Sequence, residues 1–519
     1  MKGIFLDASQ IREIQLSPTV FTRMPNLRFL NFYNPPYSSN GEFSLSLHSL
    51  ECFPDDLIYL SWEYYPLKSF PSNFMPECLV ELRLPDSSVE QLWEGIKTLV
   101  NLRVIDLKRC KNLTKIPDLS RAKKLKRLSV DGCESLLELP SMIHLVSLEP
   151  NLHVNLCSNL KKFPEVPQHL KSLKLTNNAI EEVPESIKFL DQLIHLDLSG
   201  SMIQTLPDSM VELKSLRSLD LSGCSTLVEF PTSVKQLPST LTSLYLQGCK
   251  SLKSVPVLPL GLTELNVYDC PSLKSVSGAQ QFQYTPYGGI FLIHLMRFGN
   301  CFNLDPNAVE IIVANTLLKI HCMANKWVKK KPGNEFVEAI VASSEISERF
   351  KYQSTNSSKT VKLHPDWQGV RSWGFVPCVV VDCDEHDVEI IRIICKFRLK
   401  TKGGDYRHFK SIWEYYRVDD QDPERFQSNH VFIWFDDNML QEDENYEEAS
   451  FKFYIEGHSN NGRFDRFKVK KCGVHIFYGN AERIIINSEG QIVVKDNSLC
   501  EFGQKVKEIS MYSKKYLLL

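Results

Sequence analysis

Apolar residues recur along the middle of the chain in a fixed pattern of a short strand, a turn and an extended segment. One copy of the pattern consists of Leu102, Ile105, Leu107, Cys110, Leu113, Ile116 and Pro117. Copies with the same spacing begin at Leu125, Leu216 and Leu241. Two apolar residues that flank one polar residue have the period of two of a β-strand, so their side chains face the same side. We expect this side to be the interior and the small cysteine to turn the chain after each strand.

The copies form a leucine-rich repeat, because a single copy cannot bury its apolar side chains alone and must stack on its neighbours. About eleven copies lie within residues 26–280, most of them 21 to 25 residues apart. At ~4.8 Å per strand the array is roughly 50 Å long. Prolines at the end of many copies predict extended convex segments, and Pro150 before a degenerate copy predicts a local irregularity. The predicted fold is an α/β leucine-rich-repeat solenoid, a horseshoe whose exposed concave face suits a macromolecular partner better than chemistry.

Two segments near the start of the chain depart from the repeat. Residues 1–25 contain a strand-like stretch at residues 3–7, and Ser17 before Pro18 predicts a short helix that ends at Met24. This segment is either a cap or junction for the solenoid or an irregular first repeat. Residues 34–54 are rich in Pro, Ser, Asn and Gly and are predicted to form a surface loop.

The pattern of residue types changes in the last part of the chain. Within a linker at residues 281–331, Asp305 and Pro306 begin a helical pattern that is expected to seal the open end of the solenoid, with a regulatory helix as the alternative. Residues 332–497 alternate β-branched and aromatic stretches with polar loops, which predicts an all-β antiparallel sandwich. The expected strands cover residues 359–363, 374–381, 388–399, 409–418, 430–435, 449–455 and 467–478. Residues 498–519 carry several lysines and are predicted to form a basic tail.

Composition narrows the class of protein. The chain has 519 residues, 43% of them hydrophobic and 24% charged, which is typical of a soluble globular protein with two or more domains. A net charge of -2 gives no general attraction to nucleic acid or anionic membrane, so neither is predicted as a partner. The first residues lack the apolar stretch of a signal peptide, and no apolar run is long enough to span a bilayer.

Cysteine usage indicates a reducing compartment. Six of the 15 cysteines fall at the turn position of a repeat, namely Cys110, Cys133, Cys157, Cys224, Cys249 and Cys270. There we expect them to act as small buried hydrophobes. No C-x-x-C pair for zinc or redox chemistry occurs. The predicted location is therefore intracellular, in the cytoplasm, with the nucleus left open as a further compartment.

Catalytic signatures are absent from the sequence. It contains no H-E-x-x-H, no G-x-S-x-G and no G-x-x-x-x-G-K-[ST], so we do not expect an enzyme, a metal site, or a site for a nucleotide or other cofactor. His386 lies among three acidic residues that could attract a cation, but a solvated acidic turn is the favoured interpretation. Cys472 and His475 face opposite sides of a regular strand, which argues against a nucleophilic pair.

The candidate partner-binding residues are the exposed ones on the concave face. They are Arg103, Lys108, Arg109, Lys126, Arg127, Lys174, Asp197, Asp220, Tyr245 and Tyr268. The basic residues among them either attract an acidic partner or are solvated charges interleaved with aspartates, and the second interpretation is favoured. The two tyrosines are the better contact candidates, because tyrosine is enriched in protein interfaces.

Several stretches resemble the C-terminal half of plant TIR-type nucleotide-binding leucine-rich-repeat immune receptors. They are residues 3–7 with 21–30, the cysteine-type repeats at 128–133 and 219–224, and residues 300–304, 374–381, 429–432, 449–453 and 469–474. The resemblance covers nearly the whole chain and implies repeats followed by the family's post-repeat C-terminal jelly-roll/Ig-like domain. Residues 332–336 lack the Trp-Phe continuation that is usual in the family, so no contact residues are transferred there.

The resemblance implies the sensor half of such a receptor. The family's TIR domain and nucleotide-binding switch are missing here, and its NAD-cleaving activity belongs to that TIR domain. In such receptors the repeats and the jelly roll recognise a pathogen effector and help to hold the switch off. The implied partners are a pathogen effector, a guarded host protein or a full-length receptor. The alternative is a general interaction scaffold or adaptor outside immunity, including one that binds carbohydrate through Trp367, Trp373 or Trp413, although such tryptophans are more often core residues.

Overall fold

The computed structural model of the protein describes residues 2–7, 13–33, 44–47, 49–230, 237–259, 261–277, 293–327, 336–363, 372–383, 390–416, 426–442, 446–459, 462–464, 468–479, 484–486 and 492–494. The chain divides into an N-terminal unit, residues 1–227 with 231–234, and a C-terminal unit, residues 228–230 with 235–519. Trp367, His386 and the predicted basic tail lie outside the described residues.

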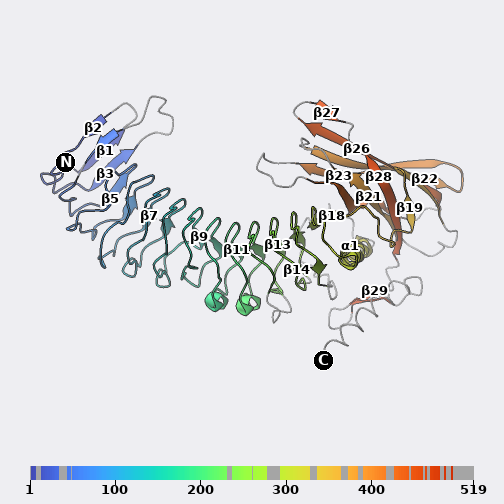
Figure 1. Ribbon diagram of the computed structural model, residues 1–519, viewed down its shortest axis with the longest axis horizontal. Helices are drawn as coiled ribbons and strands as arrows, with labels where there is room; N and C mark the ends of the chain where they lie inside the picture. The colour runs from blue at the N-terminus through green and yellow to red at the C-terminus, as the bar shows by residue number, and fades with distance from the viewer. Residues whose placement is uncertain are drawn as a thin grey trace. The chain divides into compact units, whose positions relative to one another are not determined.

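The N-terminal unit is a solenoid of stacked parallel strands (Figure 1). The first run consists of β1 (Gly3–Asp7), β3 (Phe29–Tyr33), β5 (Tyr59–Trp62), β6 (Glu81–Arg83), β7 (Val104–Asp106) and β8 (Arg127–Ser129). The second run consists of β9 (Asn151–His153), β10 (Ser172–Lys174), β11 (His195–Asp197) and β12 (Ser218–Asp220). Leu82, Leu173 and Leu196 at the strand centres are at most 1% exposed, which confirms the inward-facing leucines. The two runs belong to different sheets, so the ladder is interrupted between β8 and β9, where Pro150 predicts an irregularity.

The opposite side of this solenoid contains little helix. Two short 3-10 helices, η2 (Glu185–Phe189) and η3 (Asp208–Glu212), each follow a proline in extended conformation. In the described part of this side, isolated parallel bridges also join neighbouring segments, Lys115 to Glu138 and Glu182 to Thr205. This agrees with the expectation drawn from the prolines, which remove a backbone donor and block a longer helix.

The start of the chain differs from the expected helix. Residues 17–24 form consecutive turns, in which Val20 N donates to Ser17 O and Met24 N donates to Phe21 O. The predicted helix is wrong because this segment turns repeatedly, and Phe21 is buried against an aromatic cluster. The other members of the cluster are Phe53, Trp62, Tyr65, Phe70, Phe74 and Trp93.

The insertion at residues 34–54 is more than the surface loop predicted from its composition. Within it, β4 (Ser44–Ser46) pairs in parallel with β2 (Glu13–Gln15). Leu47, Leu50 and Phe53 are buried, because the aromatic cluster and its neighbours cover them. The end of the insertion therefore contributes to the hydrophobic core of the first repeats.

In the C-terminal unit the repeat strands continue directly into a β-sandwich. β13 (Ser243–Tyr245), β15 (Glu264–Asn266), β17 (Ile293–Phe298) and β18 (Phe336–Ala342) pair in parallel. β18 then pairs antiparallel with β24 (Asn429–Phe435), and the sheet continues through β21 (Ser372–Asp382) and β28 (Val469–Gly479) to β19 (Tyr352–Ser354). The last repeats and one layer of the sandwich therefore share one hydrogen-bonded sheet.

The second layer of the sandwich is antiparallel. Its order is β20 (Ser358–Lys362), β26 (Tyr446–Ser459), β22 (Ile390–Thr401) and β23 (Tyr406–Tyr416), and β27 (Gly462–Phe464) pairs with β26. Phe375 of the first layer packs between Phe397 and Phe451 of the second. The smaller elements are β14 (Ser254–Val255), β16 (Ser275–Val276), η4 (Asp437–Met439), β25 (Leu440–Glu442), β29 (Ile484–Ile486) and β30 (Ile492–Val494). The sequence predicts this sandwich but not β18, the strand that connects it to the repeats.

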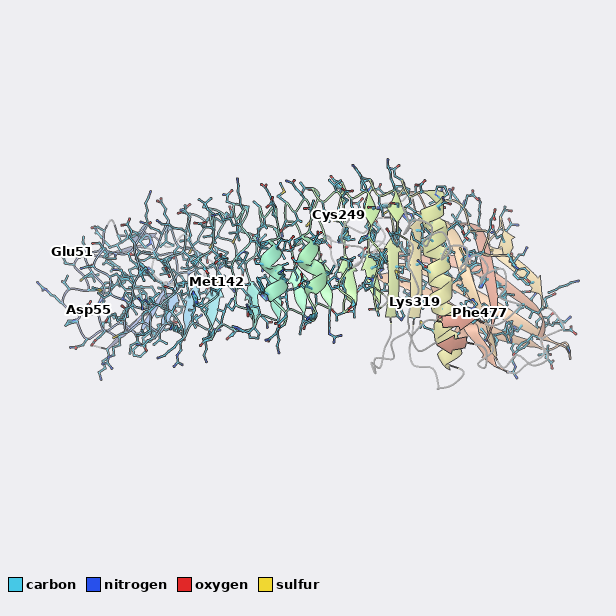
Figure 2. The ribbon with its side chains drawn as sticks, turned by 90° about the horizontal axis from the view of Figure 1, so that it is seen from below. Glu51, Asp55, Met142, Cys249, Lys319 and Phe477 are labelled. Atoms are coloured by element: carbon cyan, nitrogen blue, oxygen red, sulfur yellow. The ribbon has the colours of Figure 1, made fainter. Side chains whose placement is uncertain are left out.

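Helix α1 (Pro306–Trp327) confirms the helix predicted to begin at Asp305 and Pro306. Its apolar face buries Ile312, Val313 and Leu317. The helix packs against β16, β18 and β28, and Figure 2 shows Lys319 on it. Lys319 is buried, and its Nζ donates to the carbonyl oxygen of Leu262 at 2.9 Å. Among the described residues, no helix is both long enough and apolar enough to cross a membrane.

Candidate functional site

The exposed side of the repeat strands depends on a sharp turn that follows each strand. The residue that makes this turn has a positive φ. These turn residues are Tyr64, Asp86, Arg109, Gly132, Leu156, Asn177, Gly200, Gly223, Gly248, Asp269 and Asn300. This left-handed conformation favours glycine and, next, asparagine and aspartate. At Gly200 the neighbouring repeat also leaves no room, because an added Cβ would lie 2.2 Å from Oδ1 of Asn177.

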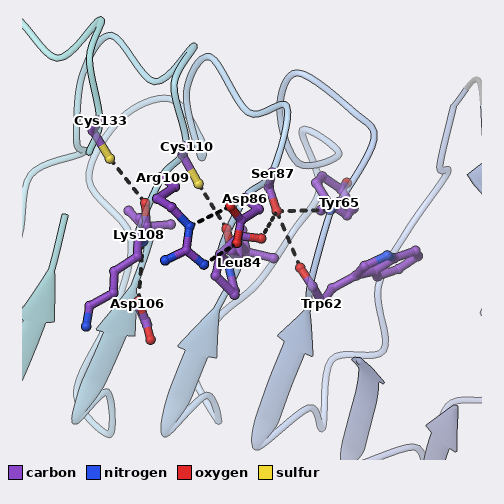
Figure 3. Close-up of polar contacts among 12 residues, drawn as sticks. Trp62, Tyr65, Leu84, Asp86, Ser87, Asp106, Lys108, Arg109, Cys110 and Cys133 are labelled. Carbon is purple, nitrogen blue, oxygen red and sulfur yellow. Dashed lines mark hydrogen bonds and ion pairs between the residues drawn. The ribbon is translucent and has the colours of Figure 1, made fainter. Parts of the chain in front are cut away.

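The next residue along the chain holds the turn by a hydrogen bond to the preceding repeat. Cys110 Sγ donates to Leu84 O at 2.9 Å, and Cys133 Sγ donates to Leu107 O at 3.1 Å (Figure 3). The same contact is made by Ser87, Cys157, Asn178, Ser201, Cys224, Cys270 and Cys301. These cysteines are thus hydrogen-bond donors as well as the small buried hydrophobes that the sequence predicts. Cys301 was not recognised as a member of this column, although Asn300 before it is a residue type that tolerates the turn.

Burial keeps most of these thiols protonated. It raises the pKa of Cys110 to about 12 and that of Cys157 to about 11. Cys270 differs, because its hydrogen bonds with the Cys249 and Cys301 thiols lower its pKa to about 5. A protonated thiol donates a hydrogen bond but is a poor nucleophile, because the thiolate is the reactive form. The hydrogen bonds of the column therefore stabilise the turns.

The basic residues predicted on the N-terminal unit reach the surface, several of them beside an acidic partner. Arg103, Lys126 and Arg127 are exposed, and Lys108 is half-buried. The Arg109 guanidinium binds both carboxylate oxygens of Asp86, with Nε to Oδ1 at 2.7 Å and Nη2 to Oδ2 at 2.6 Å (Figure 3).

Two further cations also lie near carboxylates. Arg127 Nε lies 3.8 Å from Glu149, and Arg83 Nη2 lies 3.0 Å from Glu81. Positive and negative groups thus alternate across β6 to β8, and this part of the surface can form complementary ion pairs with a partner of either sign.

Three of the other predicted residues are brought into one row. Lys174, Asp197 and Asp220 occupy the same register on β10, β11 and β12. Asp197 accepts hydrogen bonds from Ser199, which fixes its carboxylate. Burial raises the pKa of the Asp220 carboxyl above its usual value, while the hydrogen bond from Ser222 and the Lys174 charge act in the opposite direction. The three side chains of this row therefore form a polar surface that is partly shielded from water, and the strand register fixes their positions.

The two predicted tyrosines differ in their environment. Tyr245 is half-buried, and its hydroxyl donates to Glu264 at 2.6 Å. Tyr268 is only 1% exposed, so the expectation that it lies on the exposed surface is wrong. The cause is the β-sandwich, which covers the last repeats: Phe426 packs edge-on against the Tyr268 ring at 5.7 Å between centroids.

Asn300 is the centre of the polar contacts between the last repeat and the sandwich. Its side chain donates to the Tyr268 hydroxyl and accepts from Gln427 N, both at 2.9 Å. Its backbone NH donates to Nε2 of His430 at 2.9 Å. Burial lowers the pKa of His430 to about 4, so its ring is neutral and Nε2 is free to accept this bond. The interaction fixes β24 against the turn that follows β17.

A buried carboxylate makes a second connection. Glu338 on β18 is 2% exposed and accepts from Arg297 Nε at 2.6 Å and from Trp413 Nε1 at 2.8 Å. Arg297 belongs to the strand next to the last repeat and Trp413 to the outer layer of the sandwich. One side chain thus joins three parts of the C-terminal unit, and the sequence gives no local signal for it.

The carbohydrate site and the Cys–His pair considered from the sequence find little support in the described residues. Trp373 and Trp413 are 3% and 1% exposed, so neither offers an open stacking surface for a sugar. Cys472 lies near the buried Cys395 of β22, whereas His475 contacts His321 of α1, so they lie on opposite faces of β28. Within the ranges that the structure describes, no three His, Cys, Asp or Glu side chains are placed to hold a metal ion.

The fold and its exposed strand surface define a leucine-rich-repeat protein with a C-terminal β-sandwich. Leucine rich repeat family models match residues 168–225 and 78–97, and the C-JID domain model matches residues 341–483. Disease resistance protein RPS4B of Arabidopsis thaliana is 30% identical over 92% of this chain and 46% of its own length. The disease resistance-like protein DSC1 of the same plant is 27% identical over 92% of this chain and 50% of its own length.

The chain therefore contains leucine-rich repeats and a C-JID domain, and it is similar to plant disease resistance proteins over most of its own length. It spans about half the length of the curated relatives that it matches over most of its own length. Among solved structures, the leucine-rich effector protein YopM of Yersinia pestis is 26% identical over 51% of this chain and 71% of its own, with a TM-score of 0.32.

Proposed function

We propose that the chain is the protein-recognition part of a plant intracellular immune receptor, and that it binds a pathogen effector or a guarded host protein. The observation that supports this most is the exposed strand surface of a repeat array that continues into a C-JID sandwich, in a chain related to disease resistance proteins. Repeats that stack side by side offer an extended surface, which is the usual use of this architecture.

The proposed contact surface is the strand face, defined as the exposed side of β6 to β12 together with Arg103, which directly precedes β7. It presents Arg103, Lys174 and the Asp197–Asp220 pair. Their alternating charges favour a partner with a complementary pattern, and such patterns contribute specificity and association rate more than affinity. We propose that residues 26–280 form the repeats and residues 332–497 form the C-JID domain. We also propose that the protein works in the cytoplasm and that it binds a partner without catalysing a reaction.

The test is direct binding of purified candidate effectors and their host targets to the purified chain, measured by biolayer interferometry. The strand-face variant is Arg103→Glu with Lys174→Glu, because both side chains are exposed. The matched control is Lys123→Glu with Lys214→Glu, which changes the same charge on two exposed loop lysines that precede β8 and β12.

We expect at least one partner to bind the wild-type chain and the control equally, and to bind the strand-face variant roughly tenfold more weakly. A partner that binds the strand-face variant as tightly as wild type contradicts the proposed surface. A complete lack of binding by effectors and by proteins from challenged plant tissue contradicts the proposed function itself.

A further inference from the structure

The outer layer of the β-sandwich has one buried face and one exposed face. The odd-numbered side chains of β22 between residues 391 and 399 are buried, because successive side chains of a strand point to opposite faces. The even-numbered Lys396 and Arg398 are exposed on the other face. The neighbouring strands β23 and β26 alternate in the same way and expose Lys410 and Lys452.

The strand register aligns these side chains into two adjacent rows. The first row consists of Ser358, Lys452, Lys396 and Lys410 on β20, β26, β22 and β23. The second consists of Thr360, Ser450, Arg398 and His408 on the same strands. With ~4.8 Å between strands, each row spans roughly 14 Å. We call these eight residues the basic rows; they contain three lysines, an arginine, a histidine and three hydroxyl groups.

The basic rows line an open depression of about 630 Å³. Tyrosine rings hold two of the cations in place: Lys396 Nζ lies 5.0 Å from the Tyr454 ring, and the Arg398 guanidinium lies 5.1 Å from the Tyr406 ring. The hydroxyl groups add neutral donors beside the charges. The depression therefore combines ionic and neutral hydrogen-bond donors.

One carboxylate reaches the edge of the basic rows: Glu448 Oε1 accepts from Ser450 Oγ at 3.5 Å. Among the described residues, none forms an ion pair with Lys396, Arg398, Lys410 or Lys452. Like charges directly opposite each other on neighbouring strands destabilise a sheet. Three lysines in one row are therefore unfavourable in the free protein, and a bound anion would relieve their repulsion.

Acidic residues interrupt the cationic area along the strands. Glu448 lies in the next outward row at one end, where Lys362 and Lys400 flank it. At the other end Glu414 and Glu456 lie in register with Arg392, which pairs with Glu414 at 2.7 Å. A long polyanion that followed the strands would meet these carboxylates, whereas a compact anion would contact only the basic rows.

We propose that the basic rows bind a compact, multiply phosphorylated group, of the kind found in inositol polyphosphates and in phosphoinositide headgroups. Phosphate oxygens accept hydrogen bonds from lysine, arginine and hydroxyl groups together, and the arginine fork can bind two of them at once. This site lies on the C-JID domain and is distinct from the strand face, so it does not depend on the proposed protein partner.

The test uses the full chain and inositol hexakisphosphate in isothermal titration calorimetry, and vesicle sedimentation with phosphatidylcholine alone or with added phosphatidylinositol bisphosphate. The test variant is Lys396→Ala with Lys410→Ala, and the control is Lys123→Ala with Lys214→Ala. All four lysines are exposed, and circular dichroism establishes that each variant is folded.

We expect binding that the test variant weakens roughly tenfold or more and the control leaves unchanged. Affinity should fall with added salt, because the screening length drops from about 10 Å at 0.1 M to about 3 Å at 1 M. Binding to the soluble compound alone identifies a soluble ligand, and additional binding to the phosphoinositide vesicles identifies a lipid headgroup.

Three results overturn the proposal. They are no binding of either probe at low salt, equal binding by the test variant and wild type, and tighter binding of a single-stranded oligonucleotide or an acidic peptide than of inositol hexakisphosphate. The last of these would assign the basic rows to an extended polymer.

Discussion

Glu338 offers the sharpest test of how the repeats are joined to the sandwich. Replacing it by alanine removes the carboxylate that binds Arg297 and the Trp413 indole NH. Breaking a buried ion pair costs about 3–5 kcal/mol. The Arg297 side chain is 24% exposed and regains some water, which reduces this cost to about 2 kcal/mol. The buried indole NH without an acceptor adds about 1–2 kcal/mol, so Glu338→Ala should destabilise the C-terminal unit by about 3–4 kcal/mol.

Glu338→Gln separates the two contributions. The amide oxygen can still accept from the Trp413 indole, but the amide NH2 then faces Arg297, so the ion pair and its hydrogen bond are lost and we expect a cost of about 2 kcal/mol. The matched control is Glu345→Ala, whose carboxylate pairs with Lys471 at the surface and is 74% exposed. Such exposed pairs contribute about 0–1 kcal/mol.

The assay is hydrogen exchange followed by mass spectrometry, which reports the free energy of opening segment by segment. Peptides from β17, β18 and β23 should exchange faster in both Glu338 variants, and more so in the alanine variant. Peptides from β5 to β7 in the N-terminal unit serve as an internal reference and should not change. The reasoning is refuted if Glu338→Ala changes the exchange of β17 and β18 no more than Glu345→Ala does.

Three further predictions concern the turns and the junction. Gly200→Ala should lower the free energy of unfolding in urea by about 1–2 kcal/mol, because φ is positive at Gly200 and the neighbouring repeat is close. Gly95→Ala is the control and should cost less, because Gly95 also has a positive φ but open space around it. Cys224→Val should lower the free energy of unfolding by about 1–2 kcal/mol, because it leaves the buried Leu198 carbonyl without its donor. Cys224→Ser should restore most of this stability, because serine can donate the same hydrogen bond. Equal free energies of unfolding for the two variants would rule out the hydrogen bond. Burial lowers the pKa of His430 to about 4, below its value in the unfolded chain. The stability that comes from the neutral ring is therefore fully present above pH ~6.5 and is lost as the pH falls toward 4. His430→Gln should flatten this loss in thermal melts, and an unchanged pH profile would show that other groups cause it.

The repeats are predictable from the sequence because their signal is local and repeated. Each strand has its leucines at the same spacing, so the register of neighbouring strands follows once one copy is recognised. The interruption at Pro150 and the start of α1 at Pro306 are also local, since proline fixes φ and removes a donor.

The joining of the two parts is not predictable in this way. β18 carries Glu338 in the middle of a short stretch, and it becomes a strand because it pairs with β17 and β24, which are distant in sequence. Tyr268 looks like an exposed contact residue on repeat spacing alone, and only the sandwich buries it. The basic rows are hidden for the same reason, since Lys396, Lys410 and Lys452 come together only through the register of three strands.

The cysteine column shows a partial success. Position and burial of the cysteines follow from the repeat, but the thiol hydrogen bond to the preceding repeat does not. The signal was present, because Asn178 and Ser201 occupy the same position and share with cysteine a side-chain donor rather than a size. A position that accepts Cys, Asn and Ser needs a donor, and this identifies the bond.

The most direct test of the account is the exchange footprint of a bound partner on the whole chain. With any effector or host protein that binds in the interferometry experiment, the account predicts slower exchange in β6 to β12, the strands that form the strand face, and no change in the 3-10 helices η2 and η3 on the opposite side. Protection confined to η2, η3 and their neighbouring loops, with the strands unchanged, would contradict it.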